Sequence, residues 1–83
     1  MMYNFQTRCF DNVTFSVNGI TVFGTVDDTG VLWIGHDDNN HRYVIRNTGD
    51  APKVVIDGKF APSAKIVFNA KVVEIIRSGY LDI

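Results

Sequence analysis

The dipeptide Asn18-Gly19 is the feature that most constrains the fold of this chain. Both residues tolerate positive φ, and such a pair between alternating apolar segments is the strongest short-range signal for a β-hairpin. From Asn12 to Val17 polar and apolar residues alternate, as expected of a half-buried strand. A two-residue turn then sets the register of the two strands. The expected pairs are Val17 with Ile20, Phe15 with Val22 and Val13 with Gly24.

Turn residues recur after this hairpin and predict two further antiparallel strands. In residues 27–31, the glycine suits a three-residue turn that ends in a left-handed bulge and pairs Val26 with Leu32. A four-residue loop at 37–40 would then continue the register into a fourth strand. The expected pairs are His36 with His41, Ile34 with Tyr43 and Leu32 with Ile45. The result is a four-stranded meander from Val13 to Arg46, with Leu32 and Ile34 on its core side.

The rest of the chain carries weaker signals. Residues 3–8 are compatible with a further strand, and Lys53 to Ile56 form a short strand that Asp57-Gly58 ends. Ser63 and Gly79 would suit the ends of a helix between them. However, the apolar residues of 64–77 cover every side of a helical wheel, and six of them are β-branched, which favours strands. Residues 77–79 would then form a turn into a last strand at 80–83.

These signals predict one domain over residues 1–83. The predicted fold is all-β: a small antiparallel barrel or sandwich of six to eight strands, built on the four-stranded meander. The alternative is an α+β domain with a helix around residues 64–78.

Composition narrows the functional classes. The formal net charge is −1, whereas non-specific binding of duplex nucleic acid usually needs an excess of Lys and Arg. Cys9 is the single cysteine, so no intramolecular disulfide is expected, and a cytoplasmic location fits best. No apolar segment approaches the roughly 20 residues that span a bilayer, so no membrane association is expected.

The stretch Gly35–Arg42, "GHDDNNHR", holds both histidines of the chain. If His36 and His41 face each other, their Cβ atoms lie within about 5.5 Å, and Asp37 or Asp38 would supply a third metal ligand. Asp, Asn and Gly are also the residues that tight loops select, and no known ligand spacing is matched. The loop interpretation is favoured, so no metal or cofactor is predicted and the histidines are weak candidates only. Cys9 has no assignable base, so no enzyme is predicted.

The second face of the meander is the stronger candidate for function. The expected register places Trp33 and Phe23 together there with Arg42, Val44 and Arg46. Either the C-terminal strands bury this face or it is a contact surface, because a purely solvated face would not carry two aromatic side chains. Aromatic and Arg side chains dominate many binding interfaces. The predicted binding residues are Phe23, Trp33, Arg42, Val44 and Arg46, with Asp37 and Asp38 at the rim.

Three functions follow from these features. The favoured one is a non-catalytic interaction module that binds a protein partner. Its short, one-domain profile resembles phage- or mobile-element-encoded proteins that inhibit a host protein. The alternative is a small β-barrel that binds single-stranded nucleic acid or a nucleotide through the aromatic and Arg face. The least favoured is a metal-dependent enzyme using the His36/His41 loop. A homodimer through a β edge is a further partner hypothesis, since residues 71–76 would be adhesive at an edge.

Overall fold

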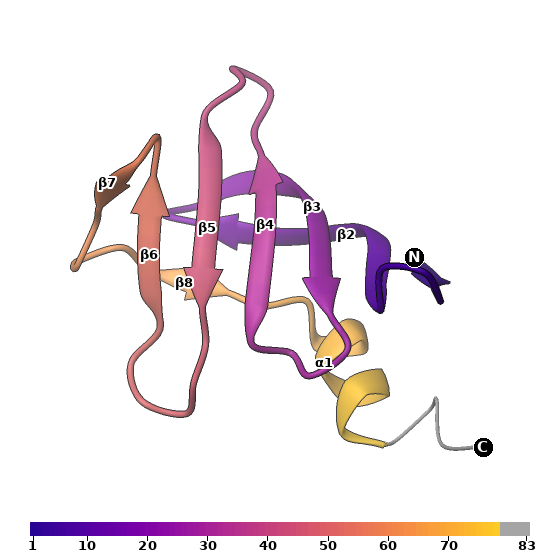
Figure 1. Ribbon diagram of the computed structural model, residues 1–83. Coiled ribbons are helices and arrows are strands. Elements are labelled where there is room, and N and C mark those ends of the chain that lie inside the picture. Colours follow the sequence, from indigo (N-terminus) through magenta and orange to yellow (C-terminus); the bar gives the residue numbers. More distant parts are fainter. Residues whose placement is uncertain (79–83) are drawn as a thin grey trace.

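The computed structural model describes residues 1–78 of the 83-residue chain, as an antiparallel sheet with one short helix (Figure 1). The strand order is β1-β2-β3-β4-β5-β6-β7, and β8 pairs with β2. The small antiparallel fold built on a meander is therefore confirmed. The elements are β1 (Met2–Asn4), β2 (Cys9–Val17), β3 (Ile20–Asp27), β4 (Leu32–His36), β5 (Arg42–Arg46), β6 (Lys53–Ile56), β7 (Lys59–Phe60), β8 (Ile66–Val67) and α1 (Ala70–Arg77).

The hairpin predicted around Asn18-Gly19 is confirmed in turn and in register. Both turn residues have positive φ, at 53° and 80°. The strands pair as Val17 with Ile20, Phe15 with Val22 and Val13 with Gly24. Asp57-Gly58 makes the same kind of turn, with φ of 50° and 79°, between β6 and β7.

The sheet bends so strongly that β2 crosses behind the strands β4 to β6 (Figure 1). One edge of β2 pairs with β3, and the other edge pairs with β1 near Cys9 and with β8 near Val17. A bulge between Phe10 and Val13 keeps both of these side chains on the buried face. In Figure 1, β2 and β8 consequently cross behind the upright strands β4 to β6.

A pair of glycines allows the close approach of β3 and β4. Gly24 lies opposite Gly35, and a Cβ on Gly35 would lie 2.5 Å from the carbonyl oxygen of Phe23. A Cβ on Gly24 would meet the backbone of Ile34 even more closely. Neither position therefore has room for a larger residue without a backbone shift.

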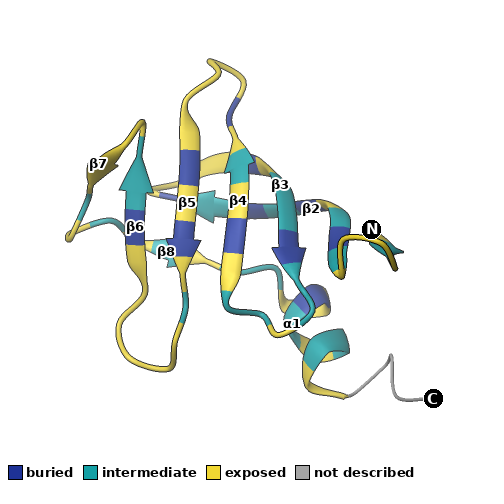
Figure 2. Ribbon diagram, in the orientation of Figure 1, coloured by how far each residue is buried: buried dark blue, intermediate teal, exposed yellow. Residues whose placement is uncertain are grey.

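The buried core lies between the two parts of the sheet, and α1 closes one end of it. Val72 is the buried residue of this helix, and Val73, Ile75 and Ile76 pack against the core with partial exposure. The alternation of buried and exposed residues along β4 and β5 is visible as colour bands in Figure 2. The buried hydrophobic residues are Phe10, Val13, Phe15, Val17, Val22, Val26, Trp33, Tyr43, Ile45, Val54 and Val72.

The strand expected at residues 71–76 is wrong, because this segment is helical. The Asn69 side chain accepts the amide of Lys71 and caps a helix that begins at Ala70. From that start the polar residues Lys71, Glu74 and Arg77 do form an exposed stripe. The stripe is hidden when residues 64–77 are treated as one element, since Ile66–Val67 belong to a strand. Residues 79–83, and the strand expected at 80–83, lie outside the described part of the chain.

The register expected for β4 is also wrong, by one residue on each side. Val26 pairs with Trp33 rather than Leu32, and Trp33 pairs with Ile45. Because side chains alternate between the faces of a sheet, this shift turns Trp33 into the core and moves Leu32 and Ile34 to the outside. Trp33 is 1% exposed, whereas Leu32 and Ile34 are 39% and 41% exposed.

The cause of the first shift is the side chain of Asp27. In the expected turn, the amide of Val31 would bond to the backbone of Asp27. In the structure, Oδ1 of Asp27 accepts the amides of Val31 and Leu32 at 2.9 and 3.1 Å. The carboxylate thus replaces a backbone partner and lengthens the turn by one residue. Gly30 keeps the predicted left-handed conformation, with φ of 77°.

The aromatic core is organised around Trp33. Its ring lies 5.5 Å from that of Phe15 and 4.7 Å from that of Phe68, measured between centroids. Its indole Nε1 donates a 2.9 Å hydrogen bond to the carbonyl of Gly30, so the polar atom of the buried ring is satisfied.

Candidate functional site

The loop between β4 and β5 does not bring the two histidines together. His36 pairs with Arg42, and the backbone of His41 pairs with Asp37 through a 3.2 Å hydrogen bond. Asn40 takes the left-handed conformation, with φ of 63°, which shortens the loop to three residues. The expected His36–His41 cross-strand pair is therefore wrong, and the two-histidine ligand geometry that depended on it is absent.

Asp37 is a structural anchor within this loop. It is 2% exposed, and its carboxylate accepts the Tyr43 hydroxyl at 2.7 Å. Oδ1 also accepts the amides of Asn39 and His41, at 2.8 and 3.1 Å. Burial raises the pKa of Asp37, but the hydrogen bonds outweigh that effect and hold its pKa below the usual value. Asp37 therefore shapes the loop from inside rather than meeting a partner at the rim.

His41 and Asp57 form an exposed pair that joins two turns. Nδ1 of His41 lies 2.6 Å from Oδ2 of Asp57, which belongs to the turn between β6 and β7. Oδ1 of Asp57 also accepts the amide of Arg42 at 2.9 Å. The hydrogen bond that the His41 ring donates to Asp57 raises the pKa of His41, and the bonds that Asp57 accepts from Arg42 and His41 lower the pKa of Asp57. The pair resembles two members of a catalytic triad, but no nucleophile accompanies it among its hydrogen-bonded partners.

The described part of the chain holds no cluster of metal-ligating side chains. Within residues 1–78, no group of three or more His, Cys, Asp and Glu side chains could hold a metal ion. The two histidines that the sequence suggested as shared metal ligands are separated in the structure. His36 lies on the outer face of β4, and His41 bonds to Asp57.

The outer face of the sheet carries a row of apolar side chains that lie directly opposite one another. Ile34 pairs with Val44, Val44 pairs with Val55, and Val55 pairs with Phe60. Thr25 of β3 pairs with Ile34 and begins the row. We call this row the outer-face ladder; it consists of Thr25, Ile34, Val44, Val55 and Phe60. Ile34 and Val44 are 41% and 38% exposed, and Phe60 is 60% exposed.

Cationic side chains flank the ladder on both sides. One flanking row contains Arg46, paired with Leu32 and with Lys53. The other contains Arg42, paired with His36, which in turn pairs with Phe23. The strands β4, β5 and β6 contain no Asp or Glu. On these three strands the outer face is therefore apolar in the centre and carries cations and no acids beside it, although the whole chain has a formal charge of −1.

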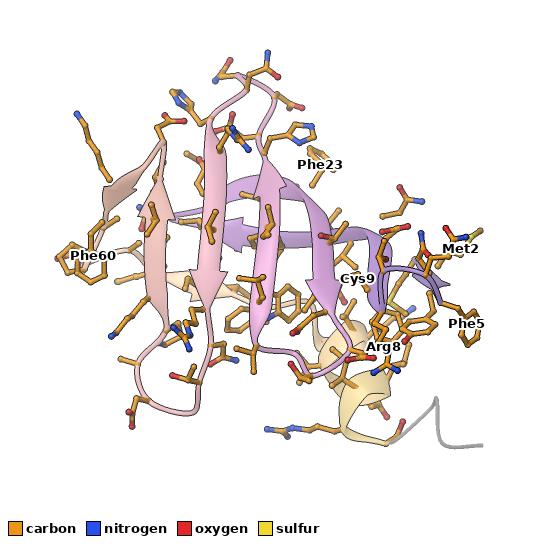
Figure 3. The ribbon with its side chains drawn as sticks, in the orientation of Figure 1. Met2, Phe5, Arg8, Cys9, Phe23 and Phe60 are labelled. Atoms are coloured by element: carbon orange, nitrogen blue, oxygen red, sulfur yellow. The ribbon has the colours of Figure 1, made fainter. Side chains whose placement is uncertain are left out.

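The predicted binding residues divide between the two faces. Phe23, Arg42, Val44 and Arg46 are exposed and share the outer face. Trp33 is buried because of the register shift, and Asp37 is buried beneath its loop, so neither can contact a partner directly. Asp38 is exposed in the loop. Figure 3 shows Phe60 to the left of strands β4 to β6 and Phe23 to their right.

Sequence reasoning missed part of this surface, namely Leu32, Ile34, Lys53, Val55 and Phe60. Leu32 and Ile34 were placed on the core side by the wrong register. Lys53 to Ile56 was correctly predicted as a strand, but its position beside β5 had no signal in the sequence. A preference for burying the largest aromatic residue would have placed Trp33 inside and Leu32 and Ile34 outside.

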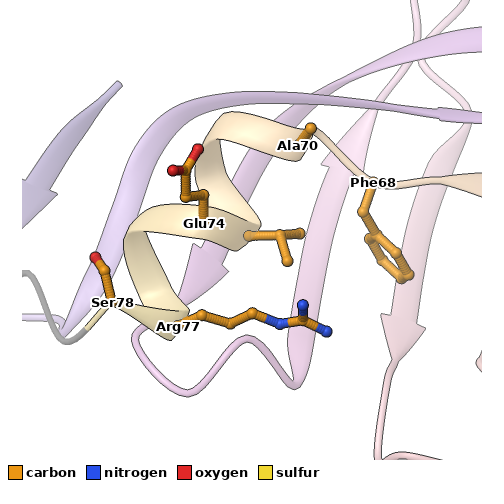
Figure 4. Close-up of a pocket in the computed structure, with 6 residues that line it drawn as sticks. Phe68, Ala70, Glu74, Arg77 and Ser78 are labelled. Atoms are coloured by element: carbon orange, nitrogen blue, oxygen red, sulfur yellow. The ribbon is translucent and has the colours of Figure 1, made fainter.

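Two of the surface pockets are larger than 500 Å³. One, of about 560 Å³, lies beside α1 and is lined by residues that include Phe68, Glu74 and Arg77 (Figure 4). The other, of about 530 Å³, lies where β2 bulges, and Phe23, Thr25 and His36 line it. The second pocket shares Thr25 with the ladder and so extends the outer face toward β2.

No family model, curated protein or solved structure matches this chain. Among the described residues, no helix has the length and apolar character that crossing a membrane requires.

Proposed function

We propose that the protein is a non-catalytic interaction module that binds a protein partner through the outer-face ladder and its flanking residues. The observation that carries the proposal is the continuous row Ile34, Val44, Val55 and Phe60 on an uncovered face. Because these side chains lie directly opposite one another on four neighbouring strands, the outer-face ladder is one contiguous apolar surface. Exposed apolar residues scattered singly would need no explanation. Covering this ladder with a partner removes apolar surface from water, which is the main driving force of protein association.

The composition of the outer-face ladder favours a protein partner over a single-stranded nucleic acid. Nucleic-acid platforms rely on aromatic rings on which bases stack. Here the centre of the face is aliphatic, and the aromatic residues Phe23 and Phe60 lie at its two ends. Trp33, the residue best suited to stacking, is 1% exposed. Aliphatic side chains instead pack well against the apolar side chains of another protein.

The proposed module acts by occupying its partner, in the manner of small phage- or mobile-element-encoded inhibitors of host proteins. Blocking a partner requires only a binding face, and a chain of 83 residues is long enough to carry one. The exposed His41–Asp57 pair has a structural explanation as a tie between two turns and is not used in this function.

The test compares two matched variants in a pull-down from cells that naturally contain the protein. Val44→Asp places a charge in the centre of the ladder, and Val67→Asp makes the same change at a 66% exposed position on β8. A stoichiometric partner is expected with the wild type and with Val67→Asp, but not with Val44→Asp. A partner retained by Val44→Asp, or no partner at all, would contradict the proposal. The melting temperatures of both variants show that each one is folded.

A further inference from the structure

The charges that flank the outer-face ladder carry an inference about its partner, which rests on the proposed function. Arg42, Arg46 and Lys53 are exposed, and within residues 1–78 none of them forms an ion pair with a carboxylate. His41–Asp57 is the one salt bridge in this part of the chain. Three of the eight Lys and Arg residues therefore stand on this face without a salt-bridge partner among the described residues.

Two acidic residues at the border of the face, Asp57 and Asp27, are already engaged in hydrogen bonds within the chain. Both oxygens of Asp57 accept hydrogen bonds, one from the amide of Arg42 and one from the ring of His41. Asp27, at the end of β3, accepts two amides with one oxygen and the hydroxyl of Thr29 with the other. These two carboxylates stabilise turns, and neither forms a salt bridge with Arg42, Arg46 or Lys53.

A partner that covers the ladder also removes water from the guanidinium groups beside it. A buried cation without a counter-charge is costly, and a neutral or basic partner would leave this cost uncompensated. Carboxylates compensate it, and each Arg offers a planar fork that binds a carboxylate through two hydrogen bonds. Charge complementarity therefore favours an acidic surface.

The spacing of the cations limits the geometry of that surface. Arg42 and Arg46 lie on the same side of β5, on either side of Val44 and four residues apart. At a rise of about 3.3 Å per residue, their Cα atoms are separated by roughly 13 Å. A matching partner has carboxylates about this far apart, with apolar side chains between them. A strand with acidic residues at its first and fifth positions and an apolar residue at the third has this pattern.

Pairing of this face with the same face of a second copy conflicts with the charges. In a two-fold symmetric contact, the same patch meets itself. Because β4, β5 and β6 carry cations and no acids, these strands offer no carboxylate to the cations of a second copy. The occupant is therefore a different surface from the ladder itself.

We propose that the outer-face ladder binds a protein segment in which carboxylates flank an apolar centre. The test uses a display library of random twelve-residue peptides, selected on the immobilised full chain and depleted on Val44→Asp. We expect the enriched peptides to be acidic with apolar residues between the acids. A synthetic enriched peptide should bind at least tenfold more weakly to Arg46→Gln/Lys53→Gln and after replacement of its own Glu and Asp by Gln and Asn. Its binding to Val67→Asp should equal that of the wild type.

The outcomes separate this inference from the proposed function. Enrichment of neutral or basic peptides that require Val44 would overturn the acidic partner and leave the interaction surface in place. Failure to obtain any peptide that distinguishes the wild type from Val44→Asp would end the proposed function as well. Self-association in analytical ultracentrifugation that Val44→Asp abolishes would overturn the inference, and so would tight binding of a twelve-residue oligo(dT) that depends on Val44 and Arg46.

Discussion

The Tyr43 hydroxyl donates a 2.7 Å hydrogen bond to Oδ2 of Asp37, joining β5 to the loop that precedes it. Both residues are almost fully buried, at 2% exposure each. Asp37 is the buried charged residue of the described chain, and the Tyr43 bond is one of three that stabilise its negative charge. The acidic loop that suggested chemistry in the sequence is thus organised around one interior hydrogen bond.

Loss of this hydroxyl should destabilise the protein. Tyr43→Phe removes a bond to a buried charged group, and we expect unfolding free energy to fall by about 2 kcal/mol. Tyr3→Phe is the matched control, because the Tyr3 hydroxyl bonds to Asp28 at 3.0 Å in a partly exposed setting. Its expected cost is below about 1 kcal/mol. If urea denaturation shows that both variants lose the same unfolding free energy, the role assigned to Tyr43 is contradicted.

The same residue should make the fold sensitive to strong alkali. Burial, together with the hydrogen bond to Asp37, raises the pKa of Tyr43 from 10.0 to about 12. A raised pKa means that the neutral form stabilises the fold; this stabilisation is complete below about pH 10 and is lost as pH rises through about 12. Absorbance at 295 nm should show a phenol ionisation near pH 12 that is accompanied by unfolding, and Tyr43→Phe should remove that step.

The His41–Asp57 pair predicts a second pH dependence, at lower pH. The pKa of His41 is raised above 6.5, so its contribution is complete below that pH and is lost as pH rises through the raised pKa. The pKa of Asp57 is lowered below 3.8, so its contribution exists above that pH and is lost as pH falls through the lowered pKa. The tie between the two turns is therefore strongest in mildly acidic solution. In an NMR titration, Asp57→Asn should lower the pKa of His41; an unchanged midpoint would show that the pair does not form in solution.

The close approach of β3 and β4 predicts that Gly24 tolerates no side chain. A Cβ there would collide with the backbone of Ile34, which cannot move without disturbing the backbone hydrogen bonds between the strands. We expect Gly24→Ala to cost about 3 kcal/mol. Gly49→Ala serves for comparison, because a Cβ there meets nothing within 4 Å and the positive φ of 98° is its one source of strain. Its cost should be about 1 to 2 kcal/mol. Thermal unfolding of both variants measures the difference.

The corrected register predicts opposite sensitivities at two adjacent positions. Trp33→Ala removes a buried ring and should cost about 3 to 5 kcal/mol, enough to unfold a marginal domain. Ile34→Ala alters an exposed outer-face side chain and should cost less than about 1 kcal/mol. Tryptophan fluorescence provides an independent measurement, since a buried indole emits at shorter wavelength and resists quenching by iodide. Easy quenching of Trp33 in the folded protein would restore the rejected register.

Local turn chemistry explains why part of the fold was predictable. Asn18-Gly19 leaves one two-residue turn type with one register, and the structure has both. Lys53–Ile56 was equally clear, because a β-branched segment runs into Asp57-Gly58. In such places a few neighbouring residues decide the backbone conformation, and no distant contact competes.

Side chains that act on the backbone explain where prediction failed. Asp27 captures two amides in its turn and moves β4 by one residue, and Asn40 with Asp37 moves β5 by one more. The first shift exchanges the buried and exposed residues of β4. The second shift compensates for the first, so the buried and exposed residues of β5 are those expected. The face assignments of Tyr43 and Ile45 were therefore correct although their expected partners were wrong. Phe23, Arg42, Val44 and Arg46 were recovered as a shared surface for the same reason.

The sequence by itself determined that this chain forms a meander of short antiparallel strands, because alternation and turn residues are local properties. Only the tertiary structure decided which side of β4 faces water, that the C-terminal segment caps the core as a helix, and that Val55 and Phe60 extend the row begun by Ile34. Those outcomes depend on one-residue register and on which strands become neighbours. Both are settled by burial of Trp33 and by contacts between residues far apart in the chain.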